Sequence, residues 1–388
     1  MKNTAKPPVR VMMLGLRAIV GAQGGVESHV RDLARGLLQS HAAEVALEVV
    51  ERARYVDASR ELGVFEGRVR LKALWCPAST GLETIVHTAL GVLYAAWRRP
   101  DVLHIHAVGP SLLTPLARLL GLRVVVTHHG EDYAREKWGR FARWALETGE
   151  AWGARFANAG IVIAAPLQGL IQRKYGRRYE FIPNAAPEAA KRDERQAVLA
   201  RWGLQAGQYF LHVGRVVPEK RQLDLIAAFA QCPGADLRLV LAGANDHPSE
   251  YENQVNAAAA LDARVVRTGA LPPADIYQLL SHARAFVLPS SHEGLPISLL
   301  EAMRCGAPVR VSDIVSLKAV ELPPDCYVPC GDVPALAKAL QALPAPGAAV
   351  DWSGWLHRYA LPAICQATVD VYRRVARRGA AAPVGEMR

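Results

Sequence analysis

The sequence lacks a long apolar segment and any paired cysteines. Its best apolar run, residues 85–97, is interrupted by His87 and Thr88 and is shorter than the ~18 residues that a membrane-spanning helix needs. The six cysteines are scattered without C-x-x-C spacing, which favours reduced structural thiols over a metal centre. The basic N-terminus does not have the pattern of a signal peptide, so we expect a cytoplasmic protein.

Zinc-finger, RNA-recognition and helix-turn-helix signatures are also missing. Their absence matters because the formal net charge is +10, and basic proteins can neutralise the phosphates of nucleic acids. The positive charge is spread along the chain, with its densest cluster at residues 373–378. We therefore expect no nucleic-acid partner, because a diffuse positive surface also suits an anionic membrane leaflet or phosphorylated small molecules.

Apolar runs that resemble buried strands alternate with helical patterns along the 388 residues. We expect helices between all of these strands, a rhythm that is typical of doubly wound parallel α/β sheets. The rhythm stops at a polar segment, residues 184–193, and then restarts, which indicates an interdomain linker. The predicted strands are residues 9–16, 101–106, 123–127 and 160–164, then 209–213, 237–241, 265–266, 285–288 and 308–311.

This organisation predicts two Rossmann-like domains, one over residues 1–185 and one over residues 186–360. Residues 361–378 are expected to form a helix that packs back towards the first domain, and residues 379–388 a flexible tail. Two such domains make a cleft between the carboxyl ends of their sheets, where open α/β sheets bind ligands.

The most informative motif is HEGLPISLLE at residues 292–301, directly after a predicted strand. Pro296 suits the first turn of a helix, whose free N–H groups can bind an anion. Glu293 and Glu301 lie near this helix start, where their carboxylates could bind hydroxyls of the same ligand. The segment alone is equally consistent with Glu293 as a helix cap and Glu301 as a solvated residue.

A second motif, GRVVPEK at residues 214–220, also leads from a strand into a helix. Arg215 and Lys220 could converge on a diphosphate, since Arg offers a planar fork and Lys a point charge. Alone, the segment is more typical of a solvated basic turn. Two such segments at strand ends of one domain favour a ligand site.

The first domain carries weaker signals at its strand ends. Gly24 and Gly25 let backbone approach an anion, and Glu27 fits a first-turn acid as well as a ligand. His106 and His129 lie at the ends of two strands, where a side chain can touch substrate. Their spacing does not support a metal site, so we favour structural or substrate-contacting histidines and predict no metal ligand.

These motifs resemble those of family 4 glycosyltransferases. Residues 293–301 match the family's E-x7-E motif, and residues 214–220 match G-R-x-x-x-E-K. The segment Ile182-Pro183-Asn184 resembles the I-P-N-G opening of the second domain, with Ala185 in place of glycine, and the usual glycines do not follow residues 312–313. G-G-x-E at residues 24–27 and T-H-H-G at 127–130 resemble bacterial enzymes of surface-polysaccharide assembly.

The resemblance implies the GT-B fold and transfer of a hexosyl group from a nucleotide-diphosphate sugar, with retention of configuration. It implies that Arg215 and Lys220 hold the diphosphate, Glu301 the ribose and Glu293 the hydroxyls of the sugar. His129 is implied near the donor sugar and the acceptor, so the implied catalytic residues are His129, Glu293, Arg215 and Lys220. The implied donor-binding residues are Gly24, Gly25, Arg215, Lys220, Gly294, Leu295 and Glu301.

The partners implied are a nucleotide-sugar donor and a lipid-linked glycan acceptor, in the synthesis of bacterial lipopolysaccharide or exopolysaccharide. We expect no cofactor and no metal, because two cations and a helix N-terminus can stabilise the leaving diphosphate and no D-x-D motif is present. The alternatives are a GT-B nucleotide-sugar 2-epimerase and a non-catalytic sugar-nucleotide or glycan-binding protein. The two paired donor motifs argue against both.

A basic and aromatic stretch at residues 133–144 raises the question of membrane contact. Trp138, Phe141 and Trp144 recur at helical spacing and are flanked by the cations Arg135, Lys137, Arg140 and Arg143. Such a helix can lie in the membrane interface. Because an apolar stripe on a globular helix is usually buried, we predict that the aromatic rings pack into the first domain. The cations alone would then contact anionic lipid at the inner face of the cytoplasmic membrane.

Overall fold

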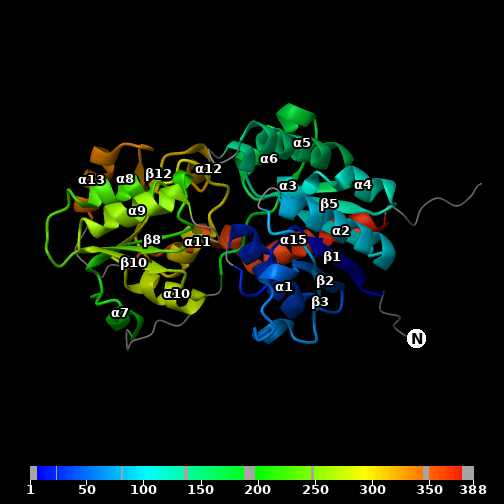
Figure 1. The fold of residues 1–388 in the computed structure, drawn as a ribbon, viewed down its shortest axis with the longest axis horizontal. Coiled ribbons are helices and arrows are strands. Elements are labelled where there is room, and N and C mark those ends of the chain that lie inside the picture. The colour runs from blue at the N-terminus through cyan, green and yellow to red at the C-terminus, as the bar shows by residue number, and fades with distance from the viewer. Residues whose placement is uncertain are drawn as a thin grey trace, which may run out of the picture. The chain divides into compact units, whose positions relative to one another are not determined.

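The computed structural model describes residues 7–22, 24–79, 82–134, 139–187, 197–245, 249–343 and 349–377. The chain divides into two units, Met1–Ala185 with Ala360–Arg388, and Ala186–Tyr359 (Figure 1). The tail at 379–388 and most of the predicted linker, from residue 188 onward, lie outside the described residues. Within the described ranges, no helix is long and apolar enough to cross a bilayer.

The first unit is built on a sheet of seven strands, all paired in parallel. β1 lies near the middle of this sheet, since Val11 pairs with Leu47 on one side and Val102 on the other. In spatial order the strands are β3 (Arg70–Leu74), β2 (Val45–Arg52), β1 (Val9–Leu14), β4 (Val102–His106), β5 (Val124–His128), β6 (Ala159–Val162) and β7 (Glu180–Phe181).

Helices cover both faces of this sheet, and β1 shows how. Val11 and Met13 pack in a core with α1 (Gly25–Ser40) and α15 (Leu361–Arg377). Met12 and Leu14 pack in a second core with α2 (Leu82–Arg98) and α4 (Thr114–Leu119). Burial on both faces explains why β1 is a continuous apolar run in the sequence. The other α-helices of this unit are α3 (Val108–Ser111), α5 (Arg140–Phe156) and α6 (Ala165–Tyr175).

The second unit repeats the design with six parallel strands. They are, in spatial order, β10 (Val265–Gly269), β9 (Arg238–Ala242), β8 (Tyr209–Val213), β11 (Ala285–Leu288), β12 (Val309–Ser312) and β13 (Tyr327–Val328). One face packs against α8 (Gln222–Phe229), α9 (Glu250–Ala260) and α13 (Val333–Gln341). Figure 1 shows α10 (Pro273–His282) and α7 (Ala197–Arg201) on the other side of the sheet. The remaining helices are α11 (Ile297–Arg304), α12 (Val315–Lys318) and α14 (Ser353–Leu356).

Both sheets have the doubly wound order that was predicted, and each reverses its order once. The reversal falls between β1 and β4 in the first unit and between β8 and β11 in the second. Open α/β sheets bind ligands at such a reversal, outside the carboxyl ends of the strands. The predicted fold class, α/β with two doubly wound domains, is confirmed.

In each sheet a glycine lets two neighbouring strand ends approach closely. Gly15 follows β1 at φ +113°, and a Cβ there would lie 2.3 Å from the carbonyl oxygen of His106. Gly243 follows β9 at φ +134°, and a Cβ there would lie 2.0 Å from the carbonyl oxygen of Gly214. Only glycine fits both the positive φ and the close contact. These contacts fix the positions of the residues that follow the strands.

The sequence analysis predicted only helices between residues 37 and 100 and missed β2 and β3, which lie there. Glu48 and Glu51 interrupt the apolar pattern of β2, although Glu51 is buried. The carboxylate of Glu51 accepts hydrogen bonds from the Arg60 side chain and, at 2.8 Å, from the backbone N–H of Ile19. Distant residues thus satisfy this charge, and local periodicity does not record them.

The predicted burial of the aromatic stripe is also wrong for the residues that the structure describes. Phe141 and Trp144 are 76% and 58% exposed at the start of α5, and Trp138 lies outside the described residues. α5 docks through small residues of its second half. A Cβ at Gly149 would lie 2.1 Å from the carbonyl oxygen of Val108 in α3, so the contact there is tight. The first turns of α5 carry their aromatic rings in solvent.

Candidate active site

Two loops meet where the second sheet reverses its order. The loop after β8 carries Lys220, and the loop after β11 carries Glu293. The backbone N–H of Ser291 donates to the carbonyl oxygen of Glu219 at 2.9 Å, which joins the loops. Lys220 Nζ donates to Glu293 Oε1 at 2.5 Å, and the two side chains are 15% and 9% exposed. The structure thus brings together two residues that the sequence assigned to the donor site.

Two buried side chains that the sequence analysis missed hold the backbone of Arg215. His212 Nδ1 donates to the carbonyl oxygen of Val287 at 2.9 Å, and its Nε2 lies 3.3 Å from the Gln222 amide nitrogen. That amide donates to the carbonyl oxygen of Arg215 at 2.8 Å. Burial lowers the pKa of His212 to about 4, so the ring is neutral and can accept this hydrogen bond. The sequence signal that could have revealed His212 is the presence of a histidine inside an otherwise apolar strand.

The E-x7-E segment forms a loop and then α11, as predicted. The N-cap residue of α11 is Pro296, which makes no side-chain cap hydrogen bond, so Glu293 is not the N-cap residue of this helix. Gly294 and Leu295 lie between Glu293 and the helix start, and Leu295 is buried. Glu301 lies within α11 and is half-buried. The helix therefore presents its first backbone N–H groups beside the Lys220–Glu293 pair.

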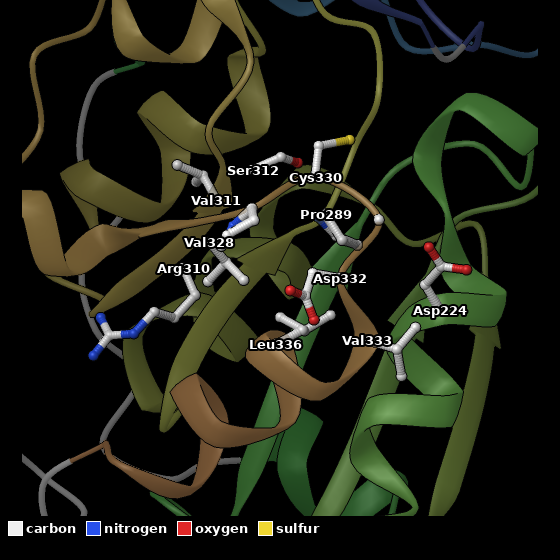
Figure 2. A pocket seen from close by; sticks show the side chains of 12 residues that line it. Asp224, Pro289, Arg310, Val311, Ser312, Val328, Cys330, Asp332, Val333 and Leu336 are labelled. Atoms are coloured by element: carbon white, nitrogen blue, oxygen red, sulfur yellow. The ribbon is translucent and has the colours of Figure 1, made fainter.

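A small pocket lies at the carboxyl ends of the next strands. Figure 2 shows Arg310, Asp332 and Cys330 on its wall. Ser312, at the position where the family's glycines are missing, also lines it. Its Oγ donates to the carbonyl oxygen of Ser290 at 2.6 Å. The lining does not include the donor-site residues, so we base the site on the two loops.

At the reversal of the first sheet, the loop that contains Gly24 and Gly25 is held by the side chains of Glu27 and Arg17. Glu27 is buried and accepts hydrogen bonds from the backbone and guanidinium of Arg17 at 3.1 and 3.0 Å. A Cβ at Gly24 would collide with these two side chains, whereas a Cβ at Gly25 would meet open space. Glu27 therefore stabilises the loop, and the assignment of Gly24 and Gly25 to the donor remains a prediction.

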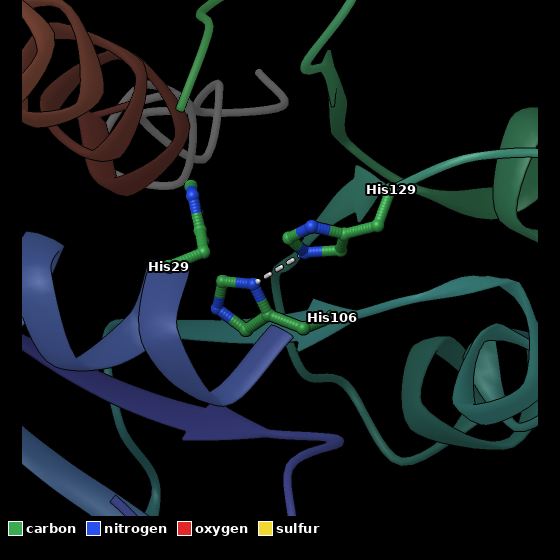
Figure 3. Close-up of side chains that lie close together, drawn as sticks. All are labelled: His29, His106 and His129. Atoms are coloured by element: carbon green, nitrogen blue, oxygen red, sulfur yellow. Dashed lines mark hydrogen bonds between the residues drawn. The ribbon is translucent and has the colours of Figure 1, made fainter. Parts of the chain in front are cut away.

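Three histidines lie together at the same edge of the first sheet (Figure 3). His29 comes from α1, His106 ends β4 and His129 directly follows β5. His106 Nδ1 lies 3.3 Å from His129 Nε2, and His29 Nδ1 lies 2.9 Å from Asn184 Oδ1. Burial lowers the pKa of His29 to about 4 and those of His106 and His129 well below the ordinary value. The three rings are therefore neutral at pH 7.

His104 lies next to this cluster and has a structural role. Its ring is fully buried, with Nδ1 2.7 Å from the Tyr372 hydroxyl and Nε2 2.7 Å from Thr127 Oγ1. Tyr372 belongs to α15, so the C-terminal helix contributes a hydrogen bond to the strand ends of the first unit.

A buried carboxylate positions the loop that carries His129. The backbone N–H of Gly130 donates to His128 Nδ1, so His128 has its proton on Nε2 and donates it to Glu150 Oε2 at 2.8 Å. Lys174 and Tyr175 donate to the other oxygen of Glu150 at 2.9 and 2.8 Å. Burial alone would raise the pKa of Glu150, but the hydrogen bonds from these three residues lower it to about 2.

The chain matches two sequence families of sugar-transferring enzymes. Residues 23–188 match the family described as Glycosyltransferase Family 4, and residues 207–345 match Glycosyl transferases group 1. A 2-deoxystreptamine N-acetyl-D-glucosaminyltransferase of Streptomyces fradiae is 31% identical over 70% of this chain and 68% of its own length. The O-antigen chain mannosyltransferase B of Escherichia coli is 29% identical over 40% of each chain.

A solved structure of Anabaena HepE with UDP and glucose has the same fold, with a TM-score of 0.70. It is 18% identical to this chain, and the alignment covers 96% of this chain and 98% of HepE. Fold, motifs and relatives together define a GT-B enzyme that transfers sugars. The chain belongs to group 1, family 4 of the glycosyltransferases.

The Glu150 network predicts a pH-dependent contribution to stability. A carboxyl whose native pKa lies below its unfolded value of 4.5 stabilises the fold above pH 4.5, and this contribution disappears as the pH falls to about 2. We expect Glu150→Gln to lower the free energy of unfolding at pH 7 by about 3 kcal/mol in urea denaturation. The difference from the unchanged protein should shrink between pH 4.5 and pH 2.

The matched control is Glu147→Gln, which removes an exposed carboxyl from the same helix. It should change stability by less than about 0.5 kcal/mol. Equal effects of the two substitutions at pH 7 would refute the role of Glu150.

Proposed function

We propose that this glycosyltransferase is metal-independent and retains anomeric configuration, and that it moves a hexosyl group from a nucleotide-diphosphate sugar to a lipid-linked glycan. The observation that carries the proposal is the meeting of Lys220 and Glu293 at the strand reversal of the second sheet, next to an uncapped helix start. Lys220 and Arg215 would hold the diphosphate, with the backbone at Gly294 and Leu295 beside them.

The remaining roles follow from the same arrangement. Glu301 would hydrogen-bond the ribose and Glu293 the hydroxyls of the transferred sugar. We assign His129 to contact with that sugar or the acceptor, and Gly24 and Gly25 to the phosphate side. The Lys220–Glu293 pair supports this assignment, since a diphosphate can replace the carboxylate as the partner of Lys220 and release Glu293 for hydroxyl groups.

In the proposed reaction the acceptor oxygen attacks the anomeric carbon from the face of the leaving group. The bond between that carbon and the phosphate oxygen breaks, and the nucleoside diphosphate leaves with the electron pair. The departing phosphate oxygen takes the acceptor's proton. Arg215, Lys220 and the start of α11 would stabilise the charge that grows on the diphosphate, which is the main demand of this step.

The acceptor class rests on the surface of α5 and on charge. Phe141 and Trp144 form an exposed aromatic pair, with ring centroids 5.7 Å apart, and Arg140 and Arg143 beside them are exposed. Exposed aromatic rings flanked by cations suit the interface of an anionic membrane. We therefore place the enzyme at the inner face of the cytoplasmic membrane, in the assembly of a bacterial surface polysaccharide.

A free acceptor is the second candidate, because a relative that is 31% identical bears the name of a 2-deoxystreptamine N-acetyl-D-glucosaminyltransferase. Transfer assays with a lipid-linked glycan and with free 2-deoxystreptamine distinguish the two. A thermal-shift series with UDP-, GDP- and dTDP-sugars identifies the donor, since a ligand at a hundredfold excess over its Kd stabilises the fold by ~2.7 kcal/mol.

We expect Lys220→Ala and Glu301→Ala each to lower the transfer rate by ~10²-fold or more. The reason is the loss of one charged contact to the diphosphate or one carboxylate contact to the ribose. The measurement is the rate of donor turnover on a defined acceptor. Lys318→Ala, which removes an exposed lysine of the same unit, should leave the rate unchanged. Near-normal turnover of both site variants, with unchanged melting temperatures, would overturn the donor-site assignment.

Transfer should also persist in EDTA, because Arg215 and Lys220 supply the positive charge that a divalent ion supplies in other enzymes. The measurement is the initial rate before and after removal of divalent ions. A rate that falls to background with EDTA and returns with Mg²⁺ or Mn²⁺ would contradict this prediction.

The protein should co-sediment with anionic vesicles and not with neutral ones, and binding should weaken as salt is added. The double variant Phe141→Ser/Trp144→Ser should lose most of this binding, because it removes the aromatic rings at headgroup depth. The matched control is Leu119→Ser, an equally exposed apolar residue of α4. Absence of binding to either vesicle at low salt would leave the free acceptor as the better candidate.

A further inference from the structure

The histidine triad, defined as His29, His106 and His129, joins three elements that are distant in the sequence. Each ring offers one nitrogen, and these three nitrogens all lie within 4.8 Å of one another. Figure 3 shows the rings of His29 and His129 gathered over His106 at the strand ends. The sequence predicted no metal ligands here, because spacing along the chain does not record this convergence.

We propose that the histidine triad binds one divalent transition-metal ion of the zinc class. Zinc takes imidazole nitrogens at ~2.0–2.1 Å in tetrahedral geometry, which places two ligand nitrogens ~3.3 Å apart. His106 Nδ1 and His129 Nε2 are already separated by 3.3 Å. The third nitrogen lies within 4.8 Å of the others, so a shift of less than ~2 Å completes the triad.

The arrangement of the triad is better explained by a bound ion than by hydrogen bonds among its three rings. One hydrogen bond between His106 and His129 leaves the ring of His29 outside it. An ion bound to all three rings would unite them in one polar site.

Asn184 prepares His29 for such a role. A metal-binding histidine usually donates its second ring N–H to an oxygen, which fixes its tautomer and orientation. Asn184 Oδ1 is 2.9 Å from His29 Nδ1 and can accept this proton, which leaves Nε2 for an ion. Burial keeps the rings neutral, the form that binds metals. The contact of Gly15 with the carbonyl oxygen of His106 holds the strand end in place.

The ligand set also says which ion belongs here. Three imidazoles favour Zn²⁺ or Co²⁺, whereas Mg²⁺ and Mn²⁺ prefer carboxylate and phosphate oxygens. Three protein ligands leave a fourth position for water or a hydroxyl of a ligand. The site lies in the first unit and shares only His129 with the residues assigned to the transfer reaction. It does not depend on Arg215, Lys220, Glu293 and Glu301, which lie in the second unit. It is consistent with transfer that persists in EDTA, because the diphosphate has its own cations.

The test is a titration of the untagged, chelator-treated full chain with Co²⁺, followed by its visible absorption and by calorimetry. We expect saturable uptake of one ion per chain, a spectrum of tetrahedral nitrogen coordination, and displacement by Zn²⁺. Absence of saturable uptake would overturn the proposal. The readout is independent of transfer activity, so its failure is distinct from failure of the proposed function.

Variants locate the ion. His29→Ala, His106→Ala and His129→Ala should each abolish the spectrum, and Asn184→Ala should weaken binding by ~10–100-fold. Asn184→Asp, which keeps an oxygen for the Nδ1–H of His29, should retain binding and serves where a histidine variant fails to fold. His357→Ala removes an exposed histidine and should change nothing. Uptake that survives His106→Ala and His129→Ala in folded protein would refute the site.

Discussion

The chemistry of this chain depends on where each parallel sheet reverses its strand order. At the reversal, neighbouring strands send their following loops to opposite sides, so polar residues gather at the carboxyl edge without blocking one another. The backbone contacts at Gly15, between β1 and β4, and at Gly243, between β9 and β8, keep the carboxyl edges narrow, since any side chain at either position would push the strand ends apart. Lys220 and Glu293 meet at one reversal and the histidine triad at the other. The two polar clusters are thus consequences of one topological feature used twice.

The two edges handle buried polarity in opposite ways. The second unit keeps full charges and pairs them, with Lys220 bound to Glu293 at 2.5 Å. The attraction between the two charges offsets the cost of removing them from water only while the two side chains remain in contact. A ligand that enters must therefore replace one of them with an equivalent charge. A diphosphate meets that condition for Lys220. The histidine triad of the first unit instead consists of neutral rings, whose pKa values are lowered by burial. Neutral rings suit hydroxyl groups and transition-metal cations, whereas the ammonium of Lys220 suits a diphosphate.

The sequence predicted what local patterns encode. Continuous apolar runs revealed β1, β8 and β11, because parallel strands are buried on both faces. The donor motifs were found because each lies in one short loop. β2 was missed because Glu51 is satisfied by Arg60 and Ile19, which periodicity cannot show. The exposure of Trp144 was missed because the close packing that decides it occurs one to two turns later, at Gly149 and Gly153. The triad was missed because its members come from three separate elements.

The donor motifs are each contained in one short segment, whereas the histidine triad is assembled from distant segments. This difference bears on how the functions are distributed along the chain. Lys220 and Glu293, which we assign to the donor, lie on two loops of neighbouring strands, so a family motif can specify them and the fold can place them. The candidate acceptor region of the first unit is assembled from α1, β4, the loop after β5 and Asn184, and it is positioned by the buried Glu150 network and by Tyr372. We propose that these long-range contacts in the first unit select the acceptor, so substitutions there should change what the enzyme accepts without changing the sugar that it transfers.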